Sequence, residues 1–477
     1  MADGSTDIVA MESQKPTSDP DLNLDPDVAL KKCIAILNAA KTDNEHFAGL
    51  LLVTQLVQSN KIDFKGRRLL FESIGFSFIN RLLSTKSVPN DCPTMIYKSL
   101  AVTILACFAT DEEILYHPQF TAKISFFLEL ISSSEGDKLI VEEVSQILST
   151  FASSEVGCQH LLRRKAVKVL CEILTKLEDR TSSHYVLVME ILKKIIYHCP
   201  QETWKAHGDS LLEFVVSNSQ KFKECMDLSK FTLCEDLTSL LFAADKSFFD
   251  KALEKNKALN KIKSNIKAGL REILQSKVKE EQRNIAMTLT SVVSELIGIQ
   301  WMVEKYDEDL TVTSQEDDFL ILVLSLVNVE VNMIINHTQH EQMADKLLLT
   351  SVCYSILEKA IGFMSGCLAT EEDTPSLQST LTKAYTITSE ALSCVTAYLL
   401  RVAANHHLSE IKQADEEFLY GSVRLLCSWI AEETVALQQE IIELLPFLLE
   451  LAEKSFKPET QGTIYYLLSF SINLLMV

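Results

Sequence analysis

Apolar and polar positions near the start of the chain follow helical spacing. Apolar residues recur every three or four positions through residues 47–57, and they do so again through residues 71–83. This period places the apolar side chains on one side of an α-helix. The pattern therefore predicts two amphipathic helices that pack as a pair, with Phe47, Leu50, Leu51, Thr54, Leu56 and Val57 on the first and Phe71, Ile74, Phe78, Leu82 and Leu83 on the second.

Helical segments continue at a regular interval after Pro93. Two sets of predicted helix starts share this interval: Thr94, Asp137 and His184 in one set, and Phe120, Arg163 and Gly208 in the other. Units of about 40–47 residues with two or three helices each are typical of armadillo and HEAT repeats. We therefore predict an all-α fold, an armadillo/HEAT-like helical-repeat solenoid.

Composition supports this fold class. The chain has 477 residues, of which 47% are hydrophobic, and only 13 are glycine and 10 are proline. So few turn-forming residues favour helices joined by short loops. The 12 cysteines are scattered without a C-x-x-C pair, and many lie inside apolar helical patterns. This distribution indicates free thiols in a reducing compartment.

Breaks in the helical pattern predict the domain boundaries. Residues 1–27 carry seven acidic residues against the single Lys15 and are expected to be a disordered acidic tail. Residues 304–318 form an acidic linker between an N-terminal armadillo-like solenoid, 28–303, and a second segment, 319–477. Shorter breaks are expected at 369–376 and 405–417. The apolar run 464–477 is too short to cross a bilayer and is interpreted as a core helix.

No sequence motif of catalysis is found. The chain lacks G-x-x-x-x-G-K-[ST], G-x-G-x-x-G, G-x-S-x-G and H-E-x-x-H, so we predict that it is not an enzyme and needs no cofactor. Neighbouring histidines and cysteines could bind a metal, but no second ligand pair stands at suitable spacing. Packing at helix ends is the better interpretation for the Cys/His pairs, and solvated histidines for His337 and His340. The residues considered are Cys158, His160, His198, Cys199, His337 and His340.

The formal charge is −20, which argues against general nucleic-acid binding and favours basic partners. Residues 251–283 are the exception, with ten Lys and Arg against four Glu. This segment also carries an apolar seam. It is either a repeat helix with solvated lysines or a basic amphipathic surface for anionic lipid, a calmodulin-like protein or an acidic peptide. The contact residues on the second interpretation are Lys255, Lys261, Lys263, Lys267 and Arg271.

Two arginines and the three tryptophans each allow a structural and a functional interpretation. Arg67 and Arg68 could hold a carboxylate across the first repeat, or simply cap and solvate a helix. Trp204, Trp301 and Trp429 are interpreted as core aromatics in preference to anchors for a partner.

Two long segments resemble a known family. Residues 67–83 follow the pattern RR-x-x-F-x-x-x-GF-x-F-x-NRLL, preceded by FAGLLLVTQ at 47–55 and followed by the pair Cys92-Pro93. Near the other end, GSVRLL at 421–426 leads into WIAEET at 429–434 and LLPFL at 444–448. The sequences of these segments, and their order along the chain, resemble those of the neurochondrin family.

The resemblance implies a noncatalytic cytoplasmic scaffold. Members of that family are linked to neurite outgrowth, dendrites, synaptic plasticity, restraint of calmodulin-dependent kinase phosphorylation and binding to cytoplasmic tails of G-protein-coupled receptors. It implies partners that are proteins, without nucleic acid, and location in the cytosol and neuronal projections with at most peripheral membrane contact. The adjacent N-terminal cysteines that family members can carry for acylation are absent before Cys33. Because family members continue well past the LLPFL segment, the chain is expected to be a truncated or alternative form.

Two other classes remain open. An armadillo-type guanine-nucleotide exchange factor also works by binding, without a catalytic triad. A nuclear-transport adaptor is a third alternative, although no regular W-x-x-x-N spacing is present.

Overall fold

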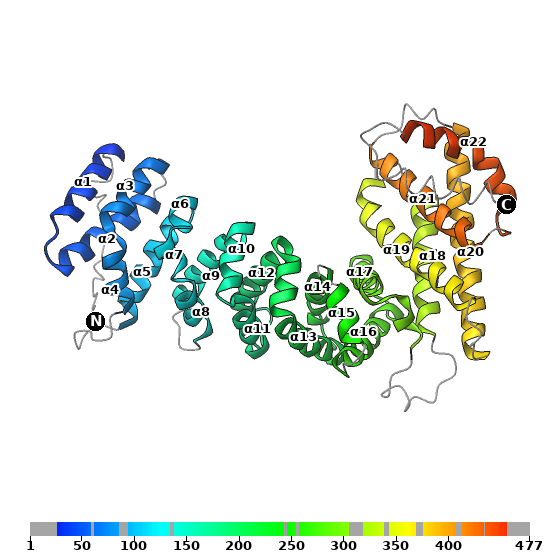
Figure 1. Ribbon diagram of the computed structural model, residues 1–477, viewed down its shortest axis with the longest axis horizontal. Helices are drawn as coiled ribbons and strands as arrows, with labels where there is room; N and C mark the ends of the chain where they lie inside the picture. The colour runs from blue at the N-terminus through cyan, green and yellow to red at the C-terminus, as the bar shows by residue number, and fades with distance from the viewer. Residues whose placement is uncertain are drawn as a thin grey trace, which may run out of the picture. The chain divides into compact units, whose positions relative to one another are not determined.

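The computed structural model describes residues 26–58, 62–84, 94–133, 138–242, 244, 246–253, 257–304, 318–337, 343–368, 375–405, 413–433 and 435–455. These residues form helices joined by short turns, and no strand occurs among them. The predicted all-α repeat fold is confirmed (Figure 1). The chain divides into two compact units, Met1–Ala166 with Val186–Ile191 (unit 1) and Val167–Tyr185 with Leu192–Val477 (unit 2).

Unit 1 is built from the helices α1 to α10 (Figure 1). Their bounds are α1 (Pro26–Ala39), α2 (Asp43–Gln58), α3 (Phe64–Ile74), α4 (Phe76–Ser84), α5 (Thr94–Phe108), α6 (Glu112–Leu115), α7 (Pro118–Thr121), α8 (Ile124–Ser132), α9 (Lys138–Ala152) and α10 (Glu155–Arg163). Helix α1 packs on α2 and α3, α4 packs on α5, and both α5 and α8 pack on α9. Each helix thus covers the apolar side of a neighbour, as repeat units require.

For the first predicted helix pair, the apolar period is confirmed but the number of helices is wrong, because the second predicted helix is two helices, α3 and α4. Phe71 and Ile74 belong to α3, whereas Phe78 and Leu82 belong to α4, and all four are buried. Gly75 separates the two helices with φ +67°, a conformation that favours glycine and ends a helix. In the first helix, Leu50 and Val57 are buried but Leu51 is exposed, and the side chain of Phe47 lies outside the described part.

Unit 2 contains the helices from α11 onward, except that residues 186–191 of α12 group with unit 1. The bounds are α11 (Ala166–Lys176), α12 (Ser183–His198), α13 (Pro200–Glu224), α14 (Ser229–Phe242), α15 (Lys246–Leu253), α16 (Lys257–Gln275), α17 (Glu280–Ile297), the 3₁₀ turn η2 (Ile299–Met302), α18 (Phe319–His337), α19 (Met343–Leu368), α20 (Pro375–Asn405), α21 (Gln413–Glu432) and α22 (Gln438–Ser455).

Within unit 2 the helices stack in two rows. In one row α13, α16, α18, α20 and α22 each pack on the next, and in the other α14, α17, α19 and α21 do the same. Successive contacts therefore join helices that lie one repeat apart in the sequence, which is how a helical-repeat solenoid buries its apolar faces. Trp204, Trp301 and Trp429 are almost fully buried in this unit, so their predicted role as core aromatics is confirmed.

The predicted repeat interval is confirmed. Helices start at Thr94, Lys138 and Ser183, each within one residue of the prediction. In the second set, α8 and α11 start three or four residues late, at Ile124 and Ala166. The shift at α11 has a local cause, because Lys165 adopts φ 58° and interrupts the helical backbone. At the third predicted start, Gly208, no new helix begins. Instead α13, which starts at Pro200, has a kink at His207.

Most of the predicted tail, linker and C-terminal run falls beyond the part of the chain that the structure describes. Residues 1–25, 305–317 and 456–477 lie outside the described residues, so these boundaries stay predictions. Helices α20 and α21 begin at Pro375 and Gln413, inside the breaks expected at 369–376 and 405–417.

Among the described residues, three helices of unit 2 are long and apolar enough to cross a membrane, judged by length and composition alone. The segments are Phe319–Asn336, Asp345–Cys367 and Leu377–Ala404. They lie in α18, α19 and α20, which pack against one another and against α17, α21 and α22. Their apolar residues thus have neighbouring helices to contact in this fold.

Candidate functional site

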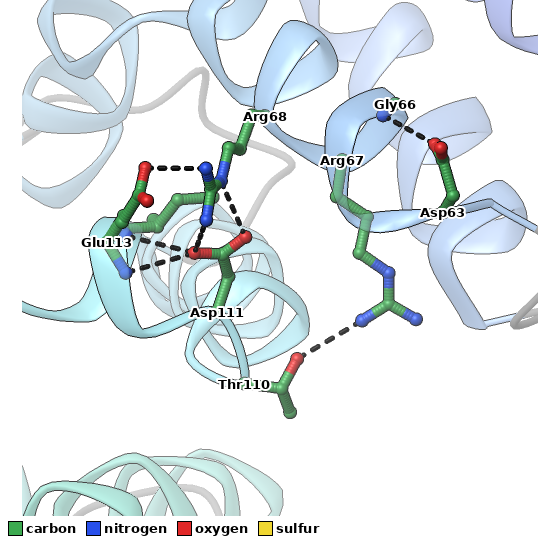
Figure 2. Close-up of polar contacts among 8 residues, drawn as sticks. Asp63, Gly66, Arg67, Arg68, Thr110, Asp111 and Glu113 are labelled. Atoms are coloured by element: carbon green, nitrogen blue, oxygen red, sulfur yellow. Dashed lines mark hydrogen bonds and ion pairs between the residues drawn. The ribbon is translucent and has the colours of Figure 1, made fainter.

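The family-like arginine motif lies at the start of α3. The Asp63 carboxylate accepts a hydrogen bond from the Gly66 backbone N–H at 2.8 Å and caps the helix. A Cβ added at Gly66 would lie 2.5 Å from the side chain of Ile62, so this turn has room only for glycine. Figure 2 shows Arg67 and Arg68 reaching from this helix toward the turn that precedes α6.

Arg68 joins two repeats through Asp111. Its Nε lies 3.1 Å from the Asp111 carboxylate, and its other nitrogens reach the same carboxylate and Glu113, the latter at 2.6 Å (Figure 2). Asp111 is buried and also caps α6, accepting the backbone N–H groups of Glu113 at 3.0 Å and Ile114 at 3.4 Å. The hydrogen bond to Asp111 raises the pKa of Arg68, with both carboxylates adding to the effect.

One of the two readings of this arginine pair is therefore confirmed for Arg68, which holds a carboxylate across the first repeat. Arg67 instead donates a hydrogen bond to the Thr110 hydroxyl at 3.1 Å (Figure 2). Because Arg68 is engaged by two carboxylates, the motif positions α6 on α3.

The basic segment 251–283 is not one continuous helix. It runs from the end of α15 through α16 to the start of α17, where Arg283 pairs with Glu330 of α18 at 2.5 Å. The apolar seam predicted along it is confirmed, since all of its residues are buried: Leu259, Ile262, Ile266, Leu270, Ile273 and Leu274. The seam belongs to the core that α16 shares with α13.

Two of the predicted contact lysines point inward. Lys263 and Lys267 are 5% and 6% exposed. The Lys263 ammonium lies 2.9 Å from the Glu304 carboxylate, and that of Lys267 donates to the Glu304 backbone carbonyl at 2.9 Å. These lysines thus tie α16 to the end of the η2 turn, and burial accounts for their positions without an external partner.

The remaining predicted contact residues differ in their surroundings. Lys261 is exposed, whereas the Arg271 guanidinium lies 5.7 Å from the ring centre of Phe319. Lys255 lies outside the described residues. The use of this helix as a contact surface stays a prediction, and it now depends on Lys261 and Arg271.

A buried polar network in unit 2 was not predicted from the sequence. The Arg180 guanidinium donates to the Tyr185 hydroxyl at 2.7 Å and to the Asn218 side-chain carbonyl at 2.6 Å. The Tyr185 hydroxyl donates to Asp236 at 2.9 Å, and Lys193 pairs with the same carboxylate at 2.9 Å. Burial and the negative charge of Asp236 raise the pKa of Tyr185. The network fastens a loop and three helices together.

A groove of about 290 Å³ opens between α19 and α21 of unit 2. Carboxylates occur in its lining, and the rest is small or apolar: Glu358, Ile361, Gly362, Cys427, Ser428, Ala431 and Glu432. Burial raises the pKa of the Cys427 thiol to about 12, so this thiol stays protonated at neutral pH. This groove was not predicted from the sequence; a signal that could have indicated it is Gly362, a glycine within an apolar helical pattern of a glycine-poor chain.

Cys158 and His160, two of the candidate metal ligands, contact different partners. Cys158 is buried and its thiol faces the Ala152 carbonyl at 3.3 Å, whereas His160 stacks on Tyr116 with ring centres 6.0 Å apart. In the part of the chain that the structure describes, no three His, Cys, Asp or Glu residues gather in a metal-like group. The side chains of His337 and His340 lie outside that part.

Comparison with solved structures supports the fold alone. An engineered protein solved by crystallography has a TM-score of 0.51 at 14% sequence identity, with 94% of this chain and 99% of that chain covered.

Sequence comparison identifies relatives along most of the chain. The chain is 31% identical to the neurochondrin of Rattus norvegicus, with 91% of this chain and 55% of the relative covered. It is 30% identical to the neurochondrin homolog of Drosophila melanogaster, with 90% and 57% covered. The chain thus spans about half the length of the curated relatives it matches. The Neurochondrin family profile matches residues 25–466, and the chain belongs to the neurochondrin family.

Proposed function

We propose that this chain is a noncatalytic scaffold that binds basic segments of other proteins along its stacked helices. The observation that carries the proposal is the distribution of charge. The formal charge is −20, and in the one basic segment Lys263 and Lys267 are buried against Glu304. Fewer positive charges are therefore exposed than the sequence suggests, and the surface attracts cationic segments.

The neurochondrin resemblance supplies the cellular setting of this proposal. It implies action in the cytosol and in neuronal projections, in neurite outgrowth, synaptic plasticity and the regulation of calmodulin-dependent kinase. The partners that fit are components of kinase pathways and cytoplasmic tails of G-protein-coupled receptors, which are often basic. Membrane contact would then be peripheral and made through such a partner.

Titration of a basic receptor-tail peptide tests the proposal. The full chain is titrated with a fluorescent tail peptide at rising salt, and the same peptide with glutamine in place of each Lys and Arg serves as the control. The affinity is expected to fall as salt screens the charges, and the control is expected to bind weakly. Binding that is insensitive to salt, or equal for the two peptides, would contradict the proposal.

A nucleotide-release assay separates the scaffold from an exchange factor. The chain is added to a G protein loaded with a fluorescent nucleotide, and no acceleration of release is expected. Acceleration that depends on the concentration of the chain would favour the exchange-factor alternative.

A further inference from the structure

The groove between α19 and α21 has a glycine in its floor, Gly362, beside side chains such as those of Ile361 and Ala431. Gly362 lies inside α19 and has no atom within 4 Å of an added Cβ, and the same is true of Gly366 one turn later. Neither glycine has a positive φ. Alanine at either position would therefore fit this fold and favour the helix, so the packing of the unit gives no reason for glycine. Bare backbone in open space permits the close approach of another chain.

The register of the two helices sets the distance between the groove's carboxylates. Helices α19 and α21 run parallel, because three contacts advance together along both: Tyr354 with Ser422 at 2.9 Å, Glu358 with Arg424 at 2.7 Å, and Ser365 with Glu432. Glu432 thus lies beside Ser365, seven residues beyond Glu358 on α19. With a rise of 1.5 Å per residue, the two carboxylates stand roughly 10 Å apart along the groove.

Each of these carboxylates retains capacity to bind. Glu358 forms an ion pair with Arg424 through one oxygen at 2.7 Å, and Glu432 accepts a hydrogen bond from Ser365 through one oxygen. A carboxylate has about four acceptor sites in total, and no contact of the second oxygen is found within the described ranges. Two acceptors roughly 10 Å apart on either side of an open glycine suit a ligand with two cations at that spacing.

We propose that this groove is the docking site of an extended basic segment of a partner protein, in which Lys or Arg side chains at positions i and i+3 meet Glu358 and Glu432 while the backbone crosses Gly362. A segment in the polyproline II conformation places residues i and i+3 on one side, about 9 Å apart, which matches the two carboxylates. The inference rests on the proposed function, because it names the site and the spacing for a basic partner.

Two peptides of equal charge test the spacing. Both are fluorescein-labelled ten-residue peptides of Pro, Gly and Ser, one with Arg at positions 4 and 7 and the other with Arg at positions 4 and 5. Fluorescence anisotropy with the full chain is expected to give at least about threefold tighter binding of the first peptide. Equal affinity of the two peptides, or no binding of the first, overturns the inference.

Substitutions then locate the site. Glu358→Gln with Glu432→Gln is expected to weaken binding of the spaced peptide about tenfold. Glu440→Gln with Glu443→Gln, on exposed positions of α22, makes the same change in charge and serves as the matched control. Gly362→Leu is expected to weaken binding by filling the floor, and Gly362→Ala is the milder variant if the leucine disturbs the helix.

The outcomes separate this inference from the proposed function. Equal losses in the two glutamine pairs, with no loss for the Gly362 variants, would leave salt-dependent binding of receptor tails intact and overturn the groove. Far-UV circular dichroism of each variant is expected to match the parent chain, so that a loss of binding reports on the groove.

Discussion

Two arginine–aspartate pairs join neighbouring repeats in different surroundings. Arg68 with Asp111 lies in unit 1, and Arg180 with Asp236 lies in unit 2. Both aspartates are only 2% exposed. The arginines differ, because the Arg68 side chain is 40% exposed and that of Arg180 is 8% exposed. In unit 1 the arginine of the pair is therefore partly exposed to water, whereas in unit 2 both side chains are buried.

The aspartates also differ in what balances their charge. Asp111 accepts two backbone N–H groups at the start of α6, so the helix terminus stabilises the carboxylate even without the arginine. Asp236 depends on side chains, those of Tyr185, Lys193 and Arg180. Loss of the partner is thus expected to cost far more in unit 2, since a buried charge without a partner is strongly unfavourable.

Asp236→Ala is expected to have the largest effect. It removes the acceptor of the Tyr185 hydroxyl and leaves the Arg180 guanidinium buried without its counter-charge, at a cost of about 3–5 kcal/mol in the free energy of unfolding. All three tryptophans, Trp204, Trp301 and Trp429, lie in unit 2. The urea midpoint of tryptophan fluorescence therefore measures the change in that unit.

Asp209→Ala supplies the control for this variant. Asp209 is exposed on α13, and its substitution is expected to change the free energy of unfolding by less than about 0.5 kcal/mol. Equal urea midpoints for the two variants would show that Asp236 does not stabilise unit 2 through the buried network.

Tyr185→Phe is expected to come second. The ring stays in the core while the hydroxyl that links Arg180 to Asp236 is lost, which is expected to cost about 1–3 kcal/mol. Tyr197→Phe, at a side chain that is 78% exposed, is the matched control. A midpoint for Tyr185→Phe equal to that of the control would contradict this role.

The same tyrosine gives unit 2 a dependence on alkaline pH. Burial and Asp236 raise the pKa of Tyr185, and burial raises that of Tyr354. Above the ordinary tyrosine pKa of about 10 the unfolded chain loses protons that the folded chain keeps, so stability falls as pH rises. Buried thiols such as Cys427, whose pKa is also raised, start this decline nearer pH 9. The stability of unit 2 is expected to fall more steeply above pH 10, and less steeply there in Tyr185→Phe.

Asp111→Ala is expected to have a smaller effect, confined to unit 1. It removes the cap of α6 and is expected to cost about 0.5–2 kcal/mol. Because unit 1 has no tryptophan, the measurement is hydrogen exchange of the amides in α3 and α6. Glu129→Ala, at an exposed position of α8, is the control, and equal exchange in the two variants would contradict the capping role.

Sequence alone predicted the parts of this comparison that depend on local spacing. The apolar period and the repeat interval gave the helix starts near Thr94, Lys138 and Ser183. The break at Gly75 was missed because the apolar period continues across it, from Ile74 to Phe78. The spacing of apolar positions gives no sign of a single residue with positive φ, such as Gly75.

Most of the polar contacts between repeats could not be predicted from the sequence. Charge counting placed Lys263 on a surface, but its partner Glu304 lies 41 residues further on. Asp236 likewise lies 51 residues after Tyr185. Which residues meet across repeats depends on the register of two packed helices, and the apolar period fixes a helix face but not that register.

Arg68→Gln is expected to have the smallest effect and so tests the comparison most finely. The variant leaves Asp111 with both backbone donors of α6, so the cap survives and only an exposed charge contact is lost. Exchange in α6 is expected to rise less than in Asp111→Ala, and the difference from the parent chain is expected to shrink at high salt, because screening already weakens the exposed pair. Lys65→Gln, at an exposed position of the same helix, controls for the change in net charge. If Arg68→Gln raised exchange as much as Asp111→Ala, independently of salt, the pair in unit 1 would depend on its arginine as the pair in unit 2 does, and the contrast drawn from exposure would fail.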